Sequence, residues 1–237
     1  MAPFGASRAG LMSVVGDDIP DSGNLQAHYA TRLLSGFSDG DTVDPFSDDA
    51  GANDAPAIGN PLYRTNILNS EPAVEYDADD HHDTGIDVDT DQPRSAYAVV
   101  RWPNDGNRSR AASVINSSGS STRFTLGVEG DNSYVLNYGD TFASVNAATT
   151  DSYVIVSYRY GSGSGEVYEN QTSKGTFSYT GNGDVGLSYF LGAANLDGSA
   201  DRHLDDNLLE LLDYQAEHSD TTRQNVEAYL NDIYGVF

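Results

Sequence analysis

The sequence contains no cysteine, which excludes disulfide bonds, thiolate metal sites and cysteine nucleophiles. It contains a single lysine, Lys174, and a single tryptophan, Trp102. No apolar run is long enough to cross a membrane as a helix. The opening stretch MAPFGASRAGLMSVVG lacks the cationic segment followed by an apolar segment that defines a signal peptide. We therefore expect neither a membrane span nor a signal peptide.

The charge of the chain is strongly one-sided. Asp and Glu number 36 against 12 Lys and Arg, which gives a formal net charge of −24. Such a chain repels phosphate backbones, so we expect no nucleic-acid partner. Abundant Asp with almost no lysine favours adaptation to molar salt, where a Debye length of about 3 Å screens self-repulsion. An ordinary acidic protein is the alternative, but acidity alone does not explain the loss of lysine.

Short runs typical of β-strands recur between turn-forming clusters, and 237 residues suit one large sandwich. In one run, Val154, Val156, Tyr158 and Tyr160 share one face, which is expected to be buried. Ile155, Ser157 and Arg159 lie on the opposite face. The expected strands are Ala73–Tyr76, Ala96–Trp102, Ala112–Ile115, Phe124–Val128, Tyr134–Tyr138, Tyr153–Tyr160, Glu166–Glu169, Gly175–Tyr179, Leu187–Leu191 and Leu208–Tyr214.

The C-terminal segment has a different period. Apolar residues recur there at i, i+3, i+4 and i+7, namely Val226, Tyr229, Leu230 and Ile233. Ser219 precedes them as an N-cap and Gly235 follows as a stop. These features predict one amphipathic helix that ends the chain.

Three stretches resemble the concanavalin A-like, laminin-G-type jelly rolls of extracellular and virion proteins. They are HYATRLLSGFSDGDTVDPF (28–46), PLYRTNILNSEPAVEYDADD (61–80) and ELLDYQAEHSDTTRQNVEAYLNDIYG (210–235). The resemblance covers residues 24–237 and implies an all-β, two-sheet antiparallel jelly-roll sandwich with one C-terminal α-helix. Residues 1–23 are then an N-terminal arm, which docks on a neighbouring subunit through Phe4, Leu11, Val14 and Val15.

Three alternating carboxylates, Glu75, Asp77 and Asp79, make a glycoside hydrolase a distant alternative. A retaining hydrolase needs a nucleophile and an acid/base carboxyl about 5 to 5.5 Å apart. Here the third position holds the shorter Asp, and the stretch lies within the hairpin that matches the jelly-roll family. We therefore expect no enzymatic activity.

Aspartates and histidines raise the question of a bound cation. Asp87, Asp89 and Asp91 offer oxygen ligands for a structural Ca²⁺ or another cation, although solvated acidic residues are an equally simple interpretation. His81 and His82 adjoin more aspartates, but neighbouring side chains on a strand point to opposite faces. These two histidines are not expected to share an ion, and no cofactor is firmly indicated.

The resemblance, the salt-adapted composition and the lack of a signal peptide together favour a virion structural protein, located on the virion surface as capsid decoration or a tail or fibre component. Its expected partners are further copies of itself and other virion proteins. The alternative is a carbohydrate-binding module that recognises a host-surface glycan, with Trp102 as a partly exposed ring on which a sugar stacks.

Overall fold

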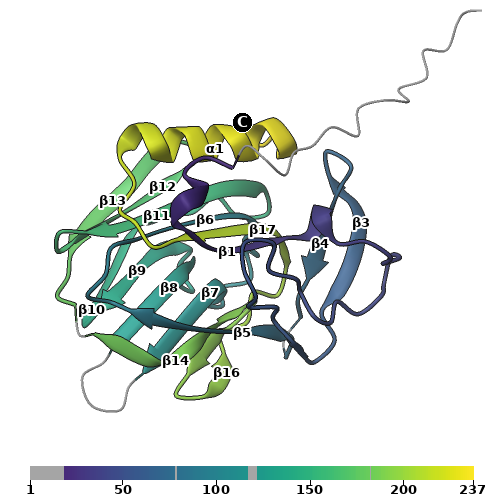
Figure 1. The fold of residues 1–237 in the computed structure, drawn as a ribbon, viewed down its shortest axis with the longest axis horizontal. Coiled ribbons are helices and arrows are strands. Elements are labelled where there is room, and N and C mark those ends of the chain that lie inside the picture. Colours follow the sequence, from purple (N-terminus) through teal and green to yellow (C-terminus); the bar gives the residue numbers. More distant parts are fainter. Residues whose placement is uncertain (1–18, 78, 117–121, 182) are drawn as a thin grey trace, which may run out of the picture.

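The computed structural model describes residues 19–77, 79–116, 122–181 and 183–237. Two β-sheets face each other across one main core (Figure 1). In the first sheet the strands lie in the order β13-β12-β11-β6-β17-β4-β3, and β1 also pairs with β17. Their bounds are β1 Leu25–Ala30, β3 Leu62–Leu68, β4 Glu71–Glu75, β6 Arg94–Arg101, β11 Tyr153–Gly161, β12 Ser164–Glu169, β13 Thr172–Ser178 and β17 Asn207–Tyr214.

The second sheet has the order β10-β9-β8-β7-β14-β5-β2. A short ribbon of β15 and β16 joins this sheet through the pairing of β15 with β7. That pairing is parallel, whereas the other pairings of the sheet are antiparallel. The bounds are β2 Ala57–Ile58, β5 His81–Asp89, β7 Ser109–Asn116, β8 Thr122–Val128, β9 Ser133–Gly139, β10 Thr141–Ala147, β14 Asp184–Leu191, β15 Ala194–Leu196 and β16 Ser199–Asp201. The expected two-sheet antiparallel sandwich is confirmed.

The main core is built by strand alternation and is rich in tyrosine. Val154, Val156, Tyr158 and Tyr160 point into it, as their spacing predicts, and each is fully buried. Tyr160 stacks on Tyr138 with ring centroids 4.2 Å apart. The hydroxyls of Tyr158 and Tyr160 donate to backbone carbonyls, that of Tyr160 to Thr125 at 3.2 Å, so burying them leaves no unpaired donor.

Helix α1 (Asp220–Tyr234) begins and ends where the sequence predicts. The Ser219 side chain accepts the Thr222 amide, and Gly235 adopts a left-handed conformation with φ 62°. Val226 and Leu230 are fully buried, whereas Tyr229 and Ile233 are partly buried. Within the described chain α1 is the one α-helix, and none of the described helices is long and apolar enough to span a membrane.

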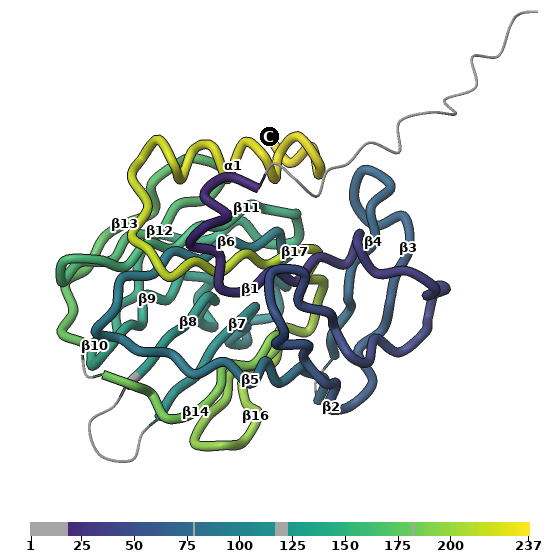
Figure 2. The backbone as a smooth tube through the Cα atoms, in the orientation of Figure 1, coloured from purple at the N-terminus to yellow at the C-terminus, as the bar shows by residue number. Residues whose placement is uncertain are grey.

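The helix covers the outer face of the first sheet, and Figure 2 shows it running along one side of the sandwich. Ile155 and Ser157 on β11 point toward it, and both are fully buried. Ser157 donates a 2.6 Å hydrogen bond to Glu227 on α1. Both faces of the first sheet are therefore covered, whereas no helix of the described residues covers the outer face of the second sheet.

A buried carboxylate ties the ends of the domain together. Glu210 on β17 accepts from Tyr234 of α1 at 2.7 Å, and lies 3.0 Å from the Arg32 Nε atom and 2.8 Å from the His28 Nε2 atom. Burial opposes ionisation of Glu210, but the bonds from His28 and Arg32 outweigh it and hold its pKa below the ordinary value. This network fastens β1 and the helix to the centre of the first sheet.

The domain starts earlier than the boundary at residue 24 that the sequence predicts. Ile19 packs against the core beneath the helix, and the Pro20 carbonyl accepts a 3.0 Å bond from Tyr214. Asp21 lies 3.1 Å from the Nε2 atom of His218. Residues 19–23 thus belong to the sandwich, because these contacts outweigh their polar, turn-rich composition. The arm residues Phe4, Leu11, Val14 and Val15 lie outside the described residues.

His82 makes the stability of the fold depend on pH. Its Nδ1 atom accepts from the Tyr76 hydroxyl at 3.0 Å and its Nε2 atom donates to the Val43 carbonyl at 2.8 Å. Burial lowers the pKa of this imidazole to about 4. The unfolded chain takes up the proton near pH 6.5 and the folded chain does not, so stability falls as pH falls between these values. From pH 7 to pH 5 we expect His82 to contribute a loss of about 2 kcal/mol.

Urea titrations at the two pH values measure this effect. His81 and His218 shift in the same direction, so the wild-type loss contains their contributions as well. His82→Gln should therefore lose about 2 kcal/mol less than wild type between pH 7 and pH 5. His203→Gln, which removes a partly buried histidine and leaves His82 in place, serves as the matched control. Equal losses in wild type and His82→Gln would contradict the assignment.

Candidate functional site

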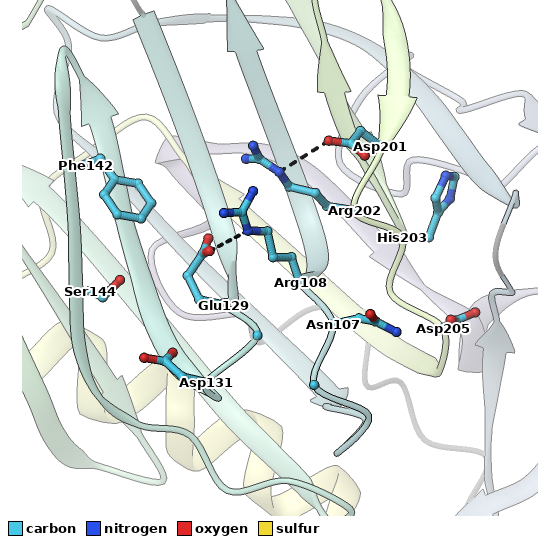
Figure 3. A pocket seen from close by; sticks show the side chains of 12 residues that line it. Asn107, Arg108, Glu129, Asp131, Phe142, Ser144, Asp201, Arg202, His203 and Asp205 are labelled. Atoms are coloured by element: carbon cyan, nitrogen blue, oxygen red, sulfur yellow. Dashed lines mark ion pairs between the residues drawn. The ribbon is translucent and has the colours of Figure 1, made fainter.

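The uncovered face of the second sheet carries an open depression. Along β8, Phe124 and Leu126 point into the core, so Arg123 and Thr125, which alternate with them, lie on the opposite face of the sheet. The hollow has a volume of about 800 Å³, and a smaller one of about 280 Å³ adjoins it and shares four of its lining residues. Figure 3 shows Arg108 and Arg202 pointing into the larger hollow, with Phe142 on one wall. Hollows of this size suit a small ligand or a few sugar rings.

The wall on the β10 side presents an aromatic ring. Phe142 is 51% exposed, while its neighbours Ala143 and Val145 pack against the core. Strand alternation therefore places an apolar ring on the solvent side of the sheet, where burying it would be favourable. Phe142 lines both hollows.

The opposite wall is formed by the β15–β16 ribbon. Asp201 ends β16 and Arg202 follows it, with the Arg202 Nε atom 3.3 Å from the Asp201 carboxylate. The next residues are fixed by Leu204, which is fully buried and whose amide donates to the Gly192 carbonyl at 2.7 Å. Arg202 is thereby held at the rim with its side chain 21% exposed.

Glu129 organises the arginines on the floor. Its two carboxylate oxygens lie 2.7 Å from Arg108 Nε and 2.6 Å from Arg110 Nη2. Arg110 is fully buried, and burial lowers its pKa to about 10 although Glu129 opposes the shift. Its stem fits because Gly127 lacks a side chain: a Cβ there would lie 2.5 Å from the Arg110 Cδ atom.

Asn137 on β9 supplies a polar group to the smaller hollow. The residue is 1% exposed, and its Nδ2 atom reaches the Thr125 hydroxyl at 3.4 Å. Its Oδ1 atom has no hydrogen-bond partner among the described residues. A buried carbonyl without a partner costs about 1 to 3 kcal/mol, which a hydroxyl of a bound ligand would recover.

The expectation of a partly exposed Trp102 is wrong. Its ring is fully buried and packs edge-on against Tyr134, with centroids 6.3 Å apart. Trp102 directly follows β6, and its side chain points between the sheets, where the main core surrounds it. It therefore cannot offer a face to a sugar. The aromatic ring at the surface is Phe142, which the sequence analysis does not single out.

Asp87, Asp89 and Asp91 do not converge. Asp87 and Asp89 belong to β5, where Asp87 accepts the Gly186 amide at 3.0 Å and Asp89 accepts the Asp91 amide at 2.9 Å. In the part of the chain that the structure describes, the one group of three candidate metal ligands lying within 4.8 Å is Asp77, Asp79 and Asp80. The carboxylates of Asp87 and Asp89 thus bond to backbone amides instead.

Glu75 and the two neighbouring histidines make contacts within the fold. Glu75 on β4 forms an ion pair with Arg64 on β3, while Asp77 and Asp79 follow the strand. His82 points into the core, and His81 stacks on Phe190 with ring centroids 4.5 Å apart. The two histidines face opposite sides of β5, as expected.

No protein-family model matches the chain, and no curated protein sequence matches it. Similar folds occur among solved structures. Domain 4 of an extracellular arabinanase from Geobacillus stearothermophilus, in complex with arabinotriose, has a TM-score of 0.60 and 17% identity, over 86% of this chain and 98% of that one. A sialidase from Trypanosoma rangeli has a TM-score of 0.57 and 10% identity, over 91% of this chain. This chain covers only 34% of the sialidase. At these identities the comparisons show the fold alone.

Proposed function

We propose that this protein binds a carbohydrate in the depression on the outer face of the second sheet. The observation that carries the proposal is the combination of a 51% exposed Phe142, an unpaired Asn137 carbonyl and several guanidinium groups around one open hollow. Sugar rings have apolar faces that stack on an aromatic ring and hydroxyls that bond to amide and guanidinium groups. The similar arabinanase domain is named as a complex with arabinotriose, which supports the same class of ligand.

Glycan binding is the alternative that the sequence analysis names, with Phe142 in the role given there to Trp102. A virion location, virion partners and the lack of enzymatic activity stay predictions. A virion surface protein that attaches to a host glycan would use this same site, so the two functions are compatible.

Replacing Phe142 with alanine is expected to weaken glycan binding at least about tenfold, because it removes the apolar face on which a sugar ring stacks. Isothermal titration calorimetry against a panel of neutral and acidic oligosaccharides measures the change. The matched control is Phe237→Ala, since Phe237 is 49% exposed and lies at the end of the chain. Unchanged binding in Phe142→Ala, or an equal loss in both variants, would contradict the proposal.

A further inference from the structure

We propose that the glycan bound at this site is acidic, and that Arg123, Arg108 and Arg202 hold its carboxylate or sulfate group. The inference rests on the proposed function and adds the chemical class of the ligand. These three arginines line the smaller hollow together with Phe142 and Asn137. A ring stacked on Phe142 therefore places its substituents within reach of guanidinium groups.

Among the described arginines, Arg123 is the one without a carboxylate partner. It lies on β8 and faces outward, because the next residue, Phe124, points into the core. Every other arginine of the described chain has a carboxylate within 4.0 Å, whereas Arg123 has none. In a chain with a net charge of −24, carboxylates are abundant. An arginine left without one beside a hollow is available to an anion from outside.

The charge balance of the smaller hollow points to the same class of ligand. Its lining contains three arginines and one carboxylate, Glu129. That carboxylate is already shared, because Arg108 and the buried Arg110 each occupy one of its oxygens. Asp201 adds a second carboxylate, which pairs with Arg202. With Arg110 included, four guanidinium groups still exceed these two carboxylates. A planar anion that accepts two parallel N–H bonds would balance this excess.

The backbone at Arg202 has an uncommon conformation beside the hollow. Arg202 has φ 54°, in the left-handed region where residues other than glycine, asparagine and aspartate are uncommon. Such strain persists where the surrounding structure holds it, and it concentrates at functional sites. Here the buried Leu204 two residues later holds the segment in place.

The rest of the surface does not favour anions. With a net charge of −24, long-range attraction to a polyanion is absent, and an acidic glycan is repelled except where cations gather. The far end of the larger hollow is acidic, since Asp131 and Asp205 line it (Figure 3). An acidic glycan that binds would therefore be held by the arginines of the smaller hollow, because the overall charge of the protein repels it.

The test compares ligands of one length that differ in charge. Trigalacturonic acid is titrated beside its fully methyl-esterified, neutral form, and a sulfated galactose trisaccharide beside the unsulfated one; trimers of glucuronate, mannuronate and arabinose complete the panel. We expect at least one acidic ligand to bind about tenfold more tightly than its neutral counterpart. If the galacturonic acid pair shows the difference in affinity, the bound group is a carboxylate; if the galactose pair shows it, the group is a sulfate.

Arg123→Gln should reduce that acidic ligand to the affinity of its neutral counterpart, and Arg202→Gln should weaken it as well. Arg64→Gln, which removes an equal charge from β3 of the first sheet, should leave the preference intact. Thermal melting checks that each variant is folded. If neutral and acidic ligands bind equally, or if Arg123→Gln and Arg202→Gln both keep the preference, the inference is overturned while the proposed function stands. If no ligand of either kind binds, both fall.

Discussion

Replacing Asp213 with alanine is expected to lower the free energy of unfolding by about 3 to 5 kcal/mol. Asp213 on β17 is fully buried, and its Oδ1 atom accepts from the Arg94 Nε atom at 2.7 Å, with a second bond from Arg94 Nη2 to the other oxygen. The Arg94 guanidinium lies over the Phe124 ring, 4.7 Å from its centroid. Without Asp213, a positive charge is left inside the sandwich without its partner.

A denaturant titration measures this loss, with Glu75→Ala as the control. Glu75 pairs with Arg64 at the surface, where the two side chains are 42% and 31% exposed, so that variant should cost less than about 1 kcal/mol. The double variant Arg94→Met with Asp213→Leu should recover most of the stability, because apolar groups of similar volume replace a buried ion pair at little cost. An Asp213→Ala variant as stable as Glu75→Ala would show that the pair is hydrated and not buried.

The second large effect is expected at the helix. Leu230→Ala should cost about 2 to 5 kcal/mol, the range for truncating a buried leucine. Leu230 is fully buried between α1 and the first sheet, in the same cluster as Val99 and Leu212. Leu33→Ala is the matched control, since Leu33 is 40% exposed and should change stability by less than about 1 kcal/mol. A cost for Leu230→Ala no greater than that of the control would mean that the helix is not docked.

The strands that the sequence predicts are those with clear apolar alternation. Two of them are β11 (Tyr153–Gly161) and β17 (Asn207–Tyr214). In both strands the inward-facing residues are buried, and most residues on the other face are buried too. The second face of β11 is buried as well, because the helix covers it. From alternation alone, the second face of such a strand would be expected to face solvent. Its burial depends on the packing of a distant segment, which alternation does not reveal.

Two strands that the sequence does not predict, β5 and β10, have a weak or hidden apolar alternation. In β5 the inward residues Thr84, Ile86 and Val88 alternate with Asp87 and Asp89, and so many aspartates hide the apolar alternation of the strand. β10 (TFASVNA) is short of large apolar residues because it lies at the end of its sheet. Its single large side chain, Phe142, faces outward.

The candidate site is harder to infer than the fold. Arg108, Arg123 and Arg202 are far apart in sequence, and they meet because β15 pairs with β7 beside β8. One signal was present in the sequence: Lys and Arg together number 12 against 36 Asp and Glu, yet Arg108, Arg110 and Arg123 fall on or beside two neighbouring strands. Which face each side chain points to depends on the β-bulge between Arg110 and Ala112, which the sequence does not reveal.

The central claim is that a glycan binds the outer face of the second sheet, and chemical-shift mapping tests it most directly. The ¹⁵N-labelled protein is titrated with the oligosaccharide that binds most tightly in the calorimetric panel. We predict that the amide shifts concentrate at Arg123, Asn137, Phe142 and Arg202, with little change in β12 and β13 of the first sheet. Shifts confined to the first sheet or to the loops around Asp77 and Asp79, with these four amides unmoved, would contradict the account.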